Sequence, residues 1–259
     1  MERDDSLVIA GQRLRSRLIL GTGKYRTMEE MVSAMEAADV EMITVALRRL
    51  DLDDPSKRTI LDYFDWAHYR LLPNTAGCQT ADEAIRVARL ARSMGLSNWI
   101  KLEVIPDAKY LLPDPVGTLE AAKQLVEDGF VVLPYINDDP VLARRLEEVG
   151  CATVMPLASP IGSGQGMANF EQIKIIVEQS NIPVVVDAGI GAPSDAALAM
   201  EIGADACLVN TAVALAGDAP LMAAAIAEGI KAGRKAFLAG RIPKKAYASA
   251  SSPIEGVLR

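Results

Sequence analysis

The chain has 259 residues, half of them apolar but only 5% aromatic, and its 27 basic and 34 acidic side chains leave a net charge of −7. That length is enough for a large core in one α/β barrel, and the acidic balance argues against nucleic acid as a partner. His68 is the only histidine, which argues against a histidine-based metal site and against a Ser-His-Asp triad.

The cysteines and the amino-terminal residues indicate the cellular compartment of the protein. Cys78, Cys151 and Cys207 are odd in number, widely separated and without C-x-x-C spacing, as expected for free thiols in a reducing compartment. The first six residues are too charged for a signal peptide, and no apolar run is long enough to span a membrane. We therefore expect a cytoplasmic protein that does not enter a membrane.

Apolar, β-branched segments alternate with amphipathic segments of helical period along the chain. The predicted strands are 18–22, 42–47, 70–74, 99–105, 131–136, 153–158, 184–189 and 206–211. The predicted helices are 28–38, 81–94, 116–128, 141–149, 170–179, 194–202 and 214–232. This alternation indicates a (β/α)8 TIM barrel, with a doubly wound sheet as the alternative.

The boundaries of this barrel follow from glycines and polar segments. We expect one domain over residues 1–259, with a short polar tail from about 243 to 259 that is mobile or folded over an opening. Glycines that end helices precede several strands: Gly95, Gly129, Gly150 and Gly203. The irregular segments 51–57 and 106–115 follow the second and fourth strands, at the end of the barrel where active-site loops gather.

Lys101 lies inside a predicted strand, where a lysine is costly. Side chains alternate between the two faces of a strand, so Lys101 and Glu103 share one face, about 6–7 Å apart, and we expect both to point into the barrel. Burial disfavours the ammonium form and so favours the neutral amine that imine chemistry needs. A structural Lys–Glu ion pair is the alternative, and this strand alone does not decide between them.

Asp187 ends a predicted strand after three valines. Aspartates in this position often cap the next helix, but Ser194 stands nearer the start of that helix and can cap it. We therefore expect Asp187 at the barrel mouth with Lys101 and Glu103. Two carboxylates beside one lysine suit a reaction with several proton transfers.

Three consecutive strands are followed by segments that can approach an anion closely. These segments are 160–166, 188–191 and Asn210-Thr211. Glycines let backbone amides surround an oxyanion, and this region of a barrel is its usual phosphate site. Flexible turns explain most single glycine loops, whereas three in succession favour a phosphate. No Walker lysine follows these glycines, so a nucleotide fingerprint is absent.

Together these motifs resemble the bacterial thiazole synthase (ThiG) family over nearly the whole chain. The resemblance is carried by the segments 17–25, 43–49, 74–78, 101–105, 160–166, 187–191 and 209–212. Ala158 and Ala192 depart from the glycine and threonine more frequent in that family, and neither removes a functional side chain.

The resemblance implies a sulfur-transferring transferase. Such enzymes join 1-deoxy-D-xylulose 5-phosphate, dehydroglycine and sulfur from a thiocarboxylated ThiS-type carrier protein into the thiazole phosphate of thiamin, without a metal or organic cofactor. It implies that Lys101 forms an imine with the sugar while Glu103 and Asp187 move protons. The implied phosphate-binding residues are Gly162, Ala188, Gly189, Asn210 and Thr211. A homotetramer, with the carrier docking at the barrel rim, is also implied.

Two other functions stay open from the sequence: another imine-forming barrel, such as an aldolase or lyase, and a non-catalytic barrel that binds sugar phosphates. Arg48 and Arg49 end the second strand and face either an anion, the carrier's tail or solvent. Cys78 is expected to be a small buried residue rather than a sulfur relay.

Overall fold

The computed structural model describes residues 5–49 and 59–252, and its centre is a barrel of eight parallel strands. The strands neighbour one another in the order β8-β7-β6-β5-β4-β3-β10-β9, and parallel bridges from Val154 to Val184 and from Leu157 to Asp187 close the ring. The strands are β3 (Leu18–Gly21), β4 (Met42–Ala46), β5 (Arg70–Asn74), β6 (Trp99–Leu102), β7 (Val131–Ile136), β8 (Met155–Pro156), β9 (Val185–Asp187) and β10 (Ala206–Val209). The predicted TIM barrel is confirmed and the doubly wound alternative is wrong.

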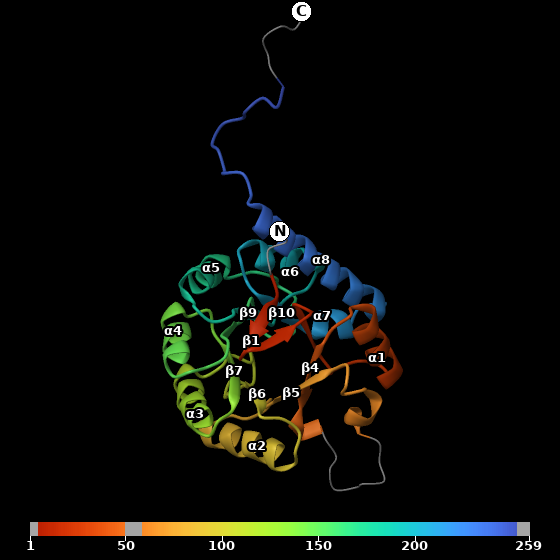
Figure 1. The fold of residues 1–259 in the computed structure, drawn as a ribbon, viewed down its shortest axis with the longest axis vertical. Helices are drawn as coiled ribbons and strands as arrows, with labels where there is room; N and C mark the ends of the chain where they lie inside the picture. Colours follow the sequence, from red (N-terminus) through yellow and green to blue (C-terminus); the bar gives the residue numbers. More distant parts are fainter. Residues whose placement is uncertain (1–4, 50–58, 253–259) are drawn as a thin grey trace, which may run out of the picture.

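Helices form an outer ring around these strands (Figure 1). They are α1 (Met28–Ala37), α2 (Ala81–Ser93), α3 (Pro115–Glu127), α4 (Pro140–Glu148), α5 (Phe170–Gln179), α6 (Pro193–Glu201), α7 (Thr211–Ala214) and α8 (Ala219–Ala239), with 3₁₀ turns η1 (Leu47–Arg49) and η2 (Ile60–Tyr63). The helix predicted over 214–232 begins later, at Ala219, and continues to Ala239, because Asp218 caps α8 by accepting a hydrogen bond from Leu221 N. The predicted loop 51–57 lies outside the described residues.

An antiparallel hairpin precedes the barrel and lies in front of its strands in Figure 1. Its strands, β1 (Leu7–Ile9) and β2 (Gln12–Leu14), were not predicted because three residues are too few to show a period. Their buried side chains pack with inward-facing residues such as Leu133 and Met155. This apolar cluster fills the barrel near the hairpin, so polar chemistry is left to the opposite end of the strands.

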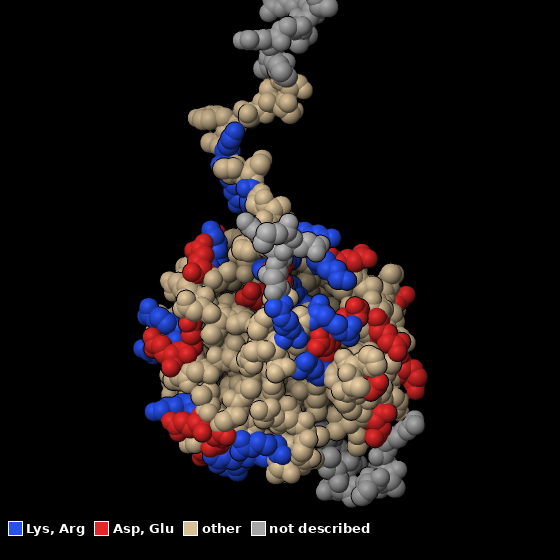
Figure 2. All heavy atoms as spheres, viewed as in Figure 1, with Lys and Arg blue, Asp and Glu red and all other residues tan. Residues whose placement is uncertain are grey.

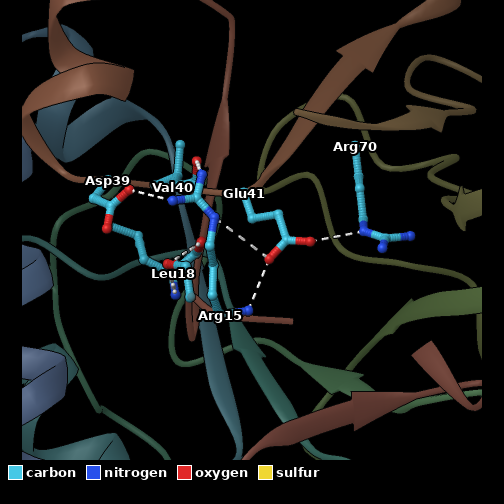
Figure 3. Close-up of polar contacts among 7 residues, drawn as sticks. Arg15, Leu18, Asp39, Val40, Glu41 and Arg70 are labelled. Carbon is cyan, nitrogen blue, oxygen red and sulfur yellow. Dashed lines mark hydrogen bonds and ion pairs between the residues drawn. The ribbon is translucent and has the colours of Figure 1, made fainter. Parts of the chain in front are cut away.

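A buried carboxylate ties together the segments that lead into neighbouring strands (Figure 3). Glu41, just before β4, accepts hydrogen bonds from Arg15 N at 2.7 Å and from Arg70 Nε at 2.8 Å. Arg15 in turn donates to Asp39 at 2.6 Å. A buried carboxylate needs such partners to offset its lost hydration, so this network is structural and lies away from the strand ends that carry the site.

Charged side chains lie mainly around the rim of the face shown in Figure 2. Beyond α8, residues 241–252 form no helix or strand, and their charged residues (Arg241, Lys244 and Lys245) are all basic. That this tail is mobile or covers an opening stays a prediction. Within residues 5–49 and 59–252, no helix is long and apolar enough to cross a membrane.

Candidate active site

Lys101, Glu103 and Asp187 meet inside the barrel, as the sequence predicted for their positions. Lys101 Nζ lies 2.9 Å from Glu103 Oε1 and 2.7 Å from Asp187 Oδ2. None of the three residues is more than 5% exposed. The ion pair that was one of the two alternatives in the sequence is therefore present, and Lys101 is an ion-pair partner of both carboxylates.

Backbone contacts hold Glu103 in place just after β6 ends. Thr75 Oγ1 accepts a hydrogen bond from Glu103 N at 2.7 Å and donates to Glu103 O at 2.8 Å. Beside it, Asn74 Nδ2 donates to Thr44 Oγ1 at 2.9 Å. These bonds pin the ends of β4, β5 and β6 to one another. The carboxylate that faces Lys101 is thus carried by a rigid edge rather than by a free loop.

The charge state of Lys101 differs from the sequence-based expectation. Burial does push its pKa down, but the charges and hydrogen bonds of Asp187 and Glu103 outweigh that effect and the pKa of Lys101 is raised. The expected neutral amine is therefore wrong for the resting site. Before it can act as a nucleophile, Lys101 has to pass a proton to a neighbouring group.

Asp187 is the natural acceptor of that proton. Burial raises the pKa of its carboxyl, and the charge and hydrogen bond of Lys101 only partly oppose this. One cation and two carboxylates give the buried cluster an excess negative charge, so it has room for an additional proton. A proton can thus move over 2.7 Å from Lys101 to Asp187, leaving an amine beside a carboxylic acid.

The expectation that Ser194 caps the helix after β9 is wrong. Helix α6 begins at Pro193, and the carboxylate of Asp195 accepts hydrogen bonds from Gly191 N and Ala192 N, both at 3.0 Å. Asp195, not Ser194, therefore holds the start of this helix. Asp187 is nevertheless left pointing into the barrel, as expected.

A cavity of about 930 Å³ opens over the cluster. Its lining includes Lys101, Glu103 and Asp187 together with all five predicted phosphate-binding residues: Gly162, Ala188, Gly189, Asn210 and Thr211. The structure thus brings every predicted site residue to one cavity at one end of the barrel. Loop residues after β6, including Asp107 and Leu111, complete the wall.

The loops after β8 and β9 are locked against each other by a close backbone approach. Gly166 N donates to Gly189 O at 2.8 Å. Gly189 has a φ of +72°, and a Cβ there would lie 1.9 Å from Ser159 Oγ and 2.6 Å from Ser159 O. Only glycine fits, and its neighbour Ala188 also has a positive φ, of 61°. This rigidity favours a preformed anion site.

The side chain of Asn210 has a structural role. With its amide oriented to face the carbonyls, its nitrogen donates to Gly21 O at 3.2 Å and to Gly23 O at 2.9 Å. The side chain thereby joins β10 to the loop after β3, and a Cβ at Gly21 would lie 2.7 Å from Asn210 Cβ. What Asn210 can offer an anion is its backbone.

Sequence reasoning missed Lys24. It has a φ of +72°, and its Nζ lies only 3.4 Å from where a Cβ would stand on Gly162, where Thr211 Oγ1 also converges at 3.5 Å. Its place two residues after Thr22, in the loop that follows β3, was the available signal. Lys24 therefore places an exposed ammonium group beside Gly162 and Thr211.

Of the residues left undecided, two are now placed. Arg48 lines the cavity, whereas the side chain of Arg49 lies outside the described part. Cys78 is buried as predicted, and burial raises the pKa of its thiol although Arg48 opposes this. Within the described residues, no group of three or more His, Cys, Asp or Glu side chains is arranged to hold a metal ion.

Comparison with known proteins places this site in a family. The family model described as "Thiazole biosynthesis protein ThiG" matches residues 8–253. A thiazole synthase of Thermosynechococcus vestitus is 62% identical, over 98% of this chain and 94% of that protein. The bifunctional protein ThiO/ThiG of Trichormus variabilis is 60% identical over 98% of this chain but only 40% of its own length.

Solved structures agree with this assignment. In the crystal structure of the Amycolatopsis orientalis BexX/CysO complex, a chain 35% identical superposes with a TM-score of 0.83, covering 93% of this chain and 98% of that one. A native KDPGal structure, 17% identical with a TM-score of 0.59, shares the fold alone. The chain therefore belongs to the ThiG family, the thiazole synthases of thiamin biosynthesis.

Proposed function

We propose that this enzyme forms the thiazole phosphate through an imine between Lys101 and the ketone of 1-deoxy-D-xylulose 5-phosphate, with dehydroglycine and a thiocarboxylated ThiS-type carrier as the other reactants. The observation that carries the proposal is the buried contact of Lys101 Nζ with both Glu103 and Asp187 beneath a cavity with glycine-rich loops. A lysine held between two proton acceptors is suited to nucleophilic attack followed by proton transfers.

The steps follow from the charges of the cluster. Lys101 passes its proton to Asp187, the amine attacks the ketone carbon, and water leaves as the imine forms. The imine makes the carbons next to it acidic, and Glu103 is placed to accept a proton from one of them. Asp187, now a carboxylic acid, can return a proton as the imine isomerises and the ring closes.

The phosphate of the sugar is proposed to bind where the loops around Gly162, Ala188 and Gly189 meet the turn at Asn210 and Thr211. Positive φ values and close packing keep these loops in one conformation, and preformed amides suit a dianion in an acidic protein. Lys24 adds a cation at the edge of this site.

We also propose a carrier protein as partner, an oligomeric state and a compartment. A chain in the crystal structure of the BexX/CysO complex is 35% identical to this one, which supports a protein partner for this enzyme. We propose a homotetramer, to be checked by light scattering of the purified enzyme. Three buried free cysteines are consistent with a cytoplasmic location.

Borohydride trapping tests the proposed function. Incubation with 1-deoxy-D-xylulose 5-phosphate and borohydride should leave the mass of the reduced sugar on the peptide that carries Lys101. Lys101→Ala should abolish this adduct. Labelling that persists in Lys101→Ala, or that maps to Lys24, would overturn the assignment, and turnover without the carrier would identify an aldolase or lyase instead.

A further inference from the structure

The described lining of the cavity carries more negative than positive side chains, although the proposed reactants are anions. It holds two cations, Lys101 and Arg48, and four carboxylates, Glu103, Asp107, Asp187 and Asp195. The charge of Lys101 is already paired with Glu103 and Asp187. A carboxylate reactant that enters this cavity therefore needs a local cation, and Arg48 is the lining residue that can supply it.

Because Gly77 has no side chain, the guanidinium of Arg48 can pack directly against the backbone of the turn after β5. Arg48 lies in η1, directly after β4, and its side chain rests on Gly77 in the turn after β5. A Cβ on Gly77 would lie 2.7 Å from Arg48 Nη1 and 3.1 Å from its Cζ, and the φ of Gly77 is +86°. Arg48 also lies close enough to Cys78 to lower the pKa of its thiol against the effect of burial. Its close packing on Gly77 orients the guanidinium against the wall of the cavity.

The position of Arg48 around the barrel separates it from the two glycine loops assigned to phosphate. In the ring of strands, β4 and β5 lie across from β8 and β9, which precede the loops with Gly162 and Gly189. Lys101, on β6, lies in the wall between these two sides. The cavity thus has an anion-binding loop cluster on one side and a cation on the other, with the nucleophile between them.

We propose that Arg48 binds the carboxylate of the two-carbon imine reactant, dehydroglycine. This inference rests on the proposed function and names a binding residue for its second small reactant. A planar guanidinium can donate two parallel hydrogen bonds to a carboxylate, which orients the reactant as well as holding it. Arg48 is exposed to the cavity rather than built into the core, so its replacement should leave the barrel folded.

The test is a single-turnover assay in which glyoxylate and ammonium generate the imine beside the sugar phosphate and the thiocarboxylated carrier. Arg48→Gln should raise the apparent KM for glyoxylate about 10- to 100-fold, the effect of losing a hydrogen bond to a charged group. The apparent KM of Arg48→Lys for glyoxylate should lie between those of Arg48→Gln and wild type. Lysine keeps the positive charge but cannot donate the two parallel hydrogen bonds of a guanidinium. Arg86→Gln, at an exposed position on α2, is the matched control and should behave as wild type.

Trapping the sugar on Lys101 separates this proposal from the previous one. All Arg48 variants should give the wild-type yield of borohydride-reduced adduct, since Arg48 acts on the other reactant. If wild type itself gives no adduct, the proposed function fails. If the adduct forms normally in Arg48→Gln and the KM for glyoxylate is unchanged, the role of Arg48 fails and the imine chemistry stands.

Two further measurements identify the anion. Wild type should prefer glyoxylate to its neutral amide, glyoxylamide, and Arg48→Gln should lose that preference. Gly77→Ala should displace the guanidinium without removing any charge, and so should raise the KM for glyoxylate as well. A rise in the KM for the carrier alone would overturn the proposal and assign Arg48 to the carrier's tail.

Discussion

Asp187 of β9 and Lys101 of β6 meet at 2.7 Å although two strands, β7 and β8, stand between them in the barrel wall. The contact therefore crosses the interior of the barrel, where water is excluded and a charge is costly. Lys101 is satisfied there because Glu103, just past the end of β6, supplies a second carboxylate at 2.9 Å. The arrangement holds the proposed nucleophile as an ammonium ion with its two proposed proton acceptors already in contact.

The two carboxylates should be needed after the imine has formed. Asp187→Asn and Glu103→Gln each leave Lys101 with one carboxylate that can take its proton, so borohydride should still trap the sugar on Lys101, although more slowly in Asp187→Asn, which lacks the main acceptor. Thiazole formation should fall by about 10²–10⁴-fold, the usual contribution of a general acid or base. Adduct yield and single-turnover rate, measured on the same samples, check this. A variant with normal turnover would remove that carboxylate from the mechanism.

Removing the lysine should instead make stability depend on pH. In Lys101→Met the buried carboxylates lose their cation, and we expect a loss of about 3–5 kcal/mol in the free energy of unfolding near neutral pH. The pKa of Asp187 is already raised in the folded protein, and without Lys101 it should rise further. A carboxyl whose pKa is higher in the folded than in the unfolded state stabilises the fold when protonated, and this contribution is lost as the pH rises through the folded-state pKa.

The difference in free energy of unfolding between wild type and Lys101→Met should therefore become smaller as the pH falls from 8 to 5, as measured by urea unfolding. The double variant Lys101→Met/Asp187→Asn is the control, because it removes one of the orphaned charges and should recover part of the loss at pH 8. A difference that stays constant between pH 8 and pH 5 would show that the ion cluster does not govern this region of the fold.

The pattern of strands and helices in the sequence predicts where a residue lies, but not the distances between side chains that only the fold sets. The alternation of strands and helices placed Lys101, Glu103 and Asp187 at one end of a barrel, because parallel strands bring their ends together. The charge of Lys101 was predicted wrongly, since its pKa depends on two carboxylates at distances that no sequence spacing gives. Lys24 was missed for the same reason: only the fold brings its ammonium group to Gly162.

Substitution of two glycines should separate loop packing from anion binding. At Gly189 a Cβ would meet Ser159 at 1.9 Å, so Gly189→Ala should disturb the loop itself, lower the melting temperature and raise the KM for the sugar phosphate sharply. At Gly162 the nearest atoms to a Cβ are 3.4–3.7 Å away. Gly162→Ala should thus cost only the strain of its positive φ, about 1–2 kcal/mol, while its methyl group narrows the phosphate site. Equal effects on melting temperature at both positions would contradict this.

Lys24 should set the salt dependence of sugar-phosphate binding. Its ammonium group is exposed and near Gly162 and Thr211, so mobile ions can screen its attraction for a dianion, whereas enclosed backbone amides are screened much less. Wild type should therefore show a KM for 1-deoxy-D-xylulose 5-phosphate that rises moderately with salt. Lys24→Gln should raise the KM about 3- to 10-fold at low salt, a loss of roughly 1 kcal/mol, and should flatten its salt dependence. Lys174→Gln, at an exposed position on α5, is the control for the loss of one positive charge. If Lys24→Gln keeps the wild-type slope, the screened cation lies elsewhere and the phosphate is held by the amides of the glycine loops alone.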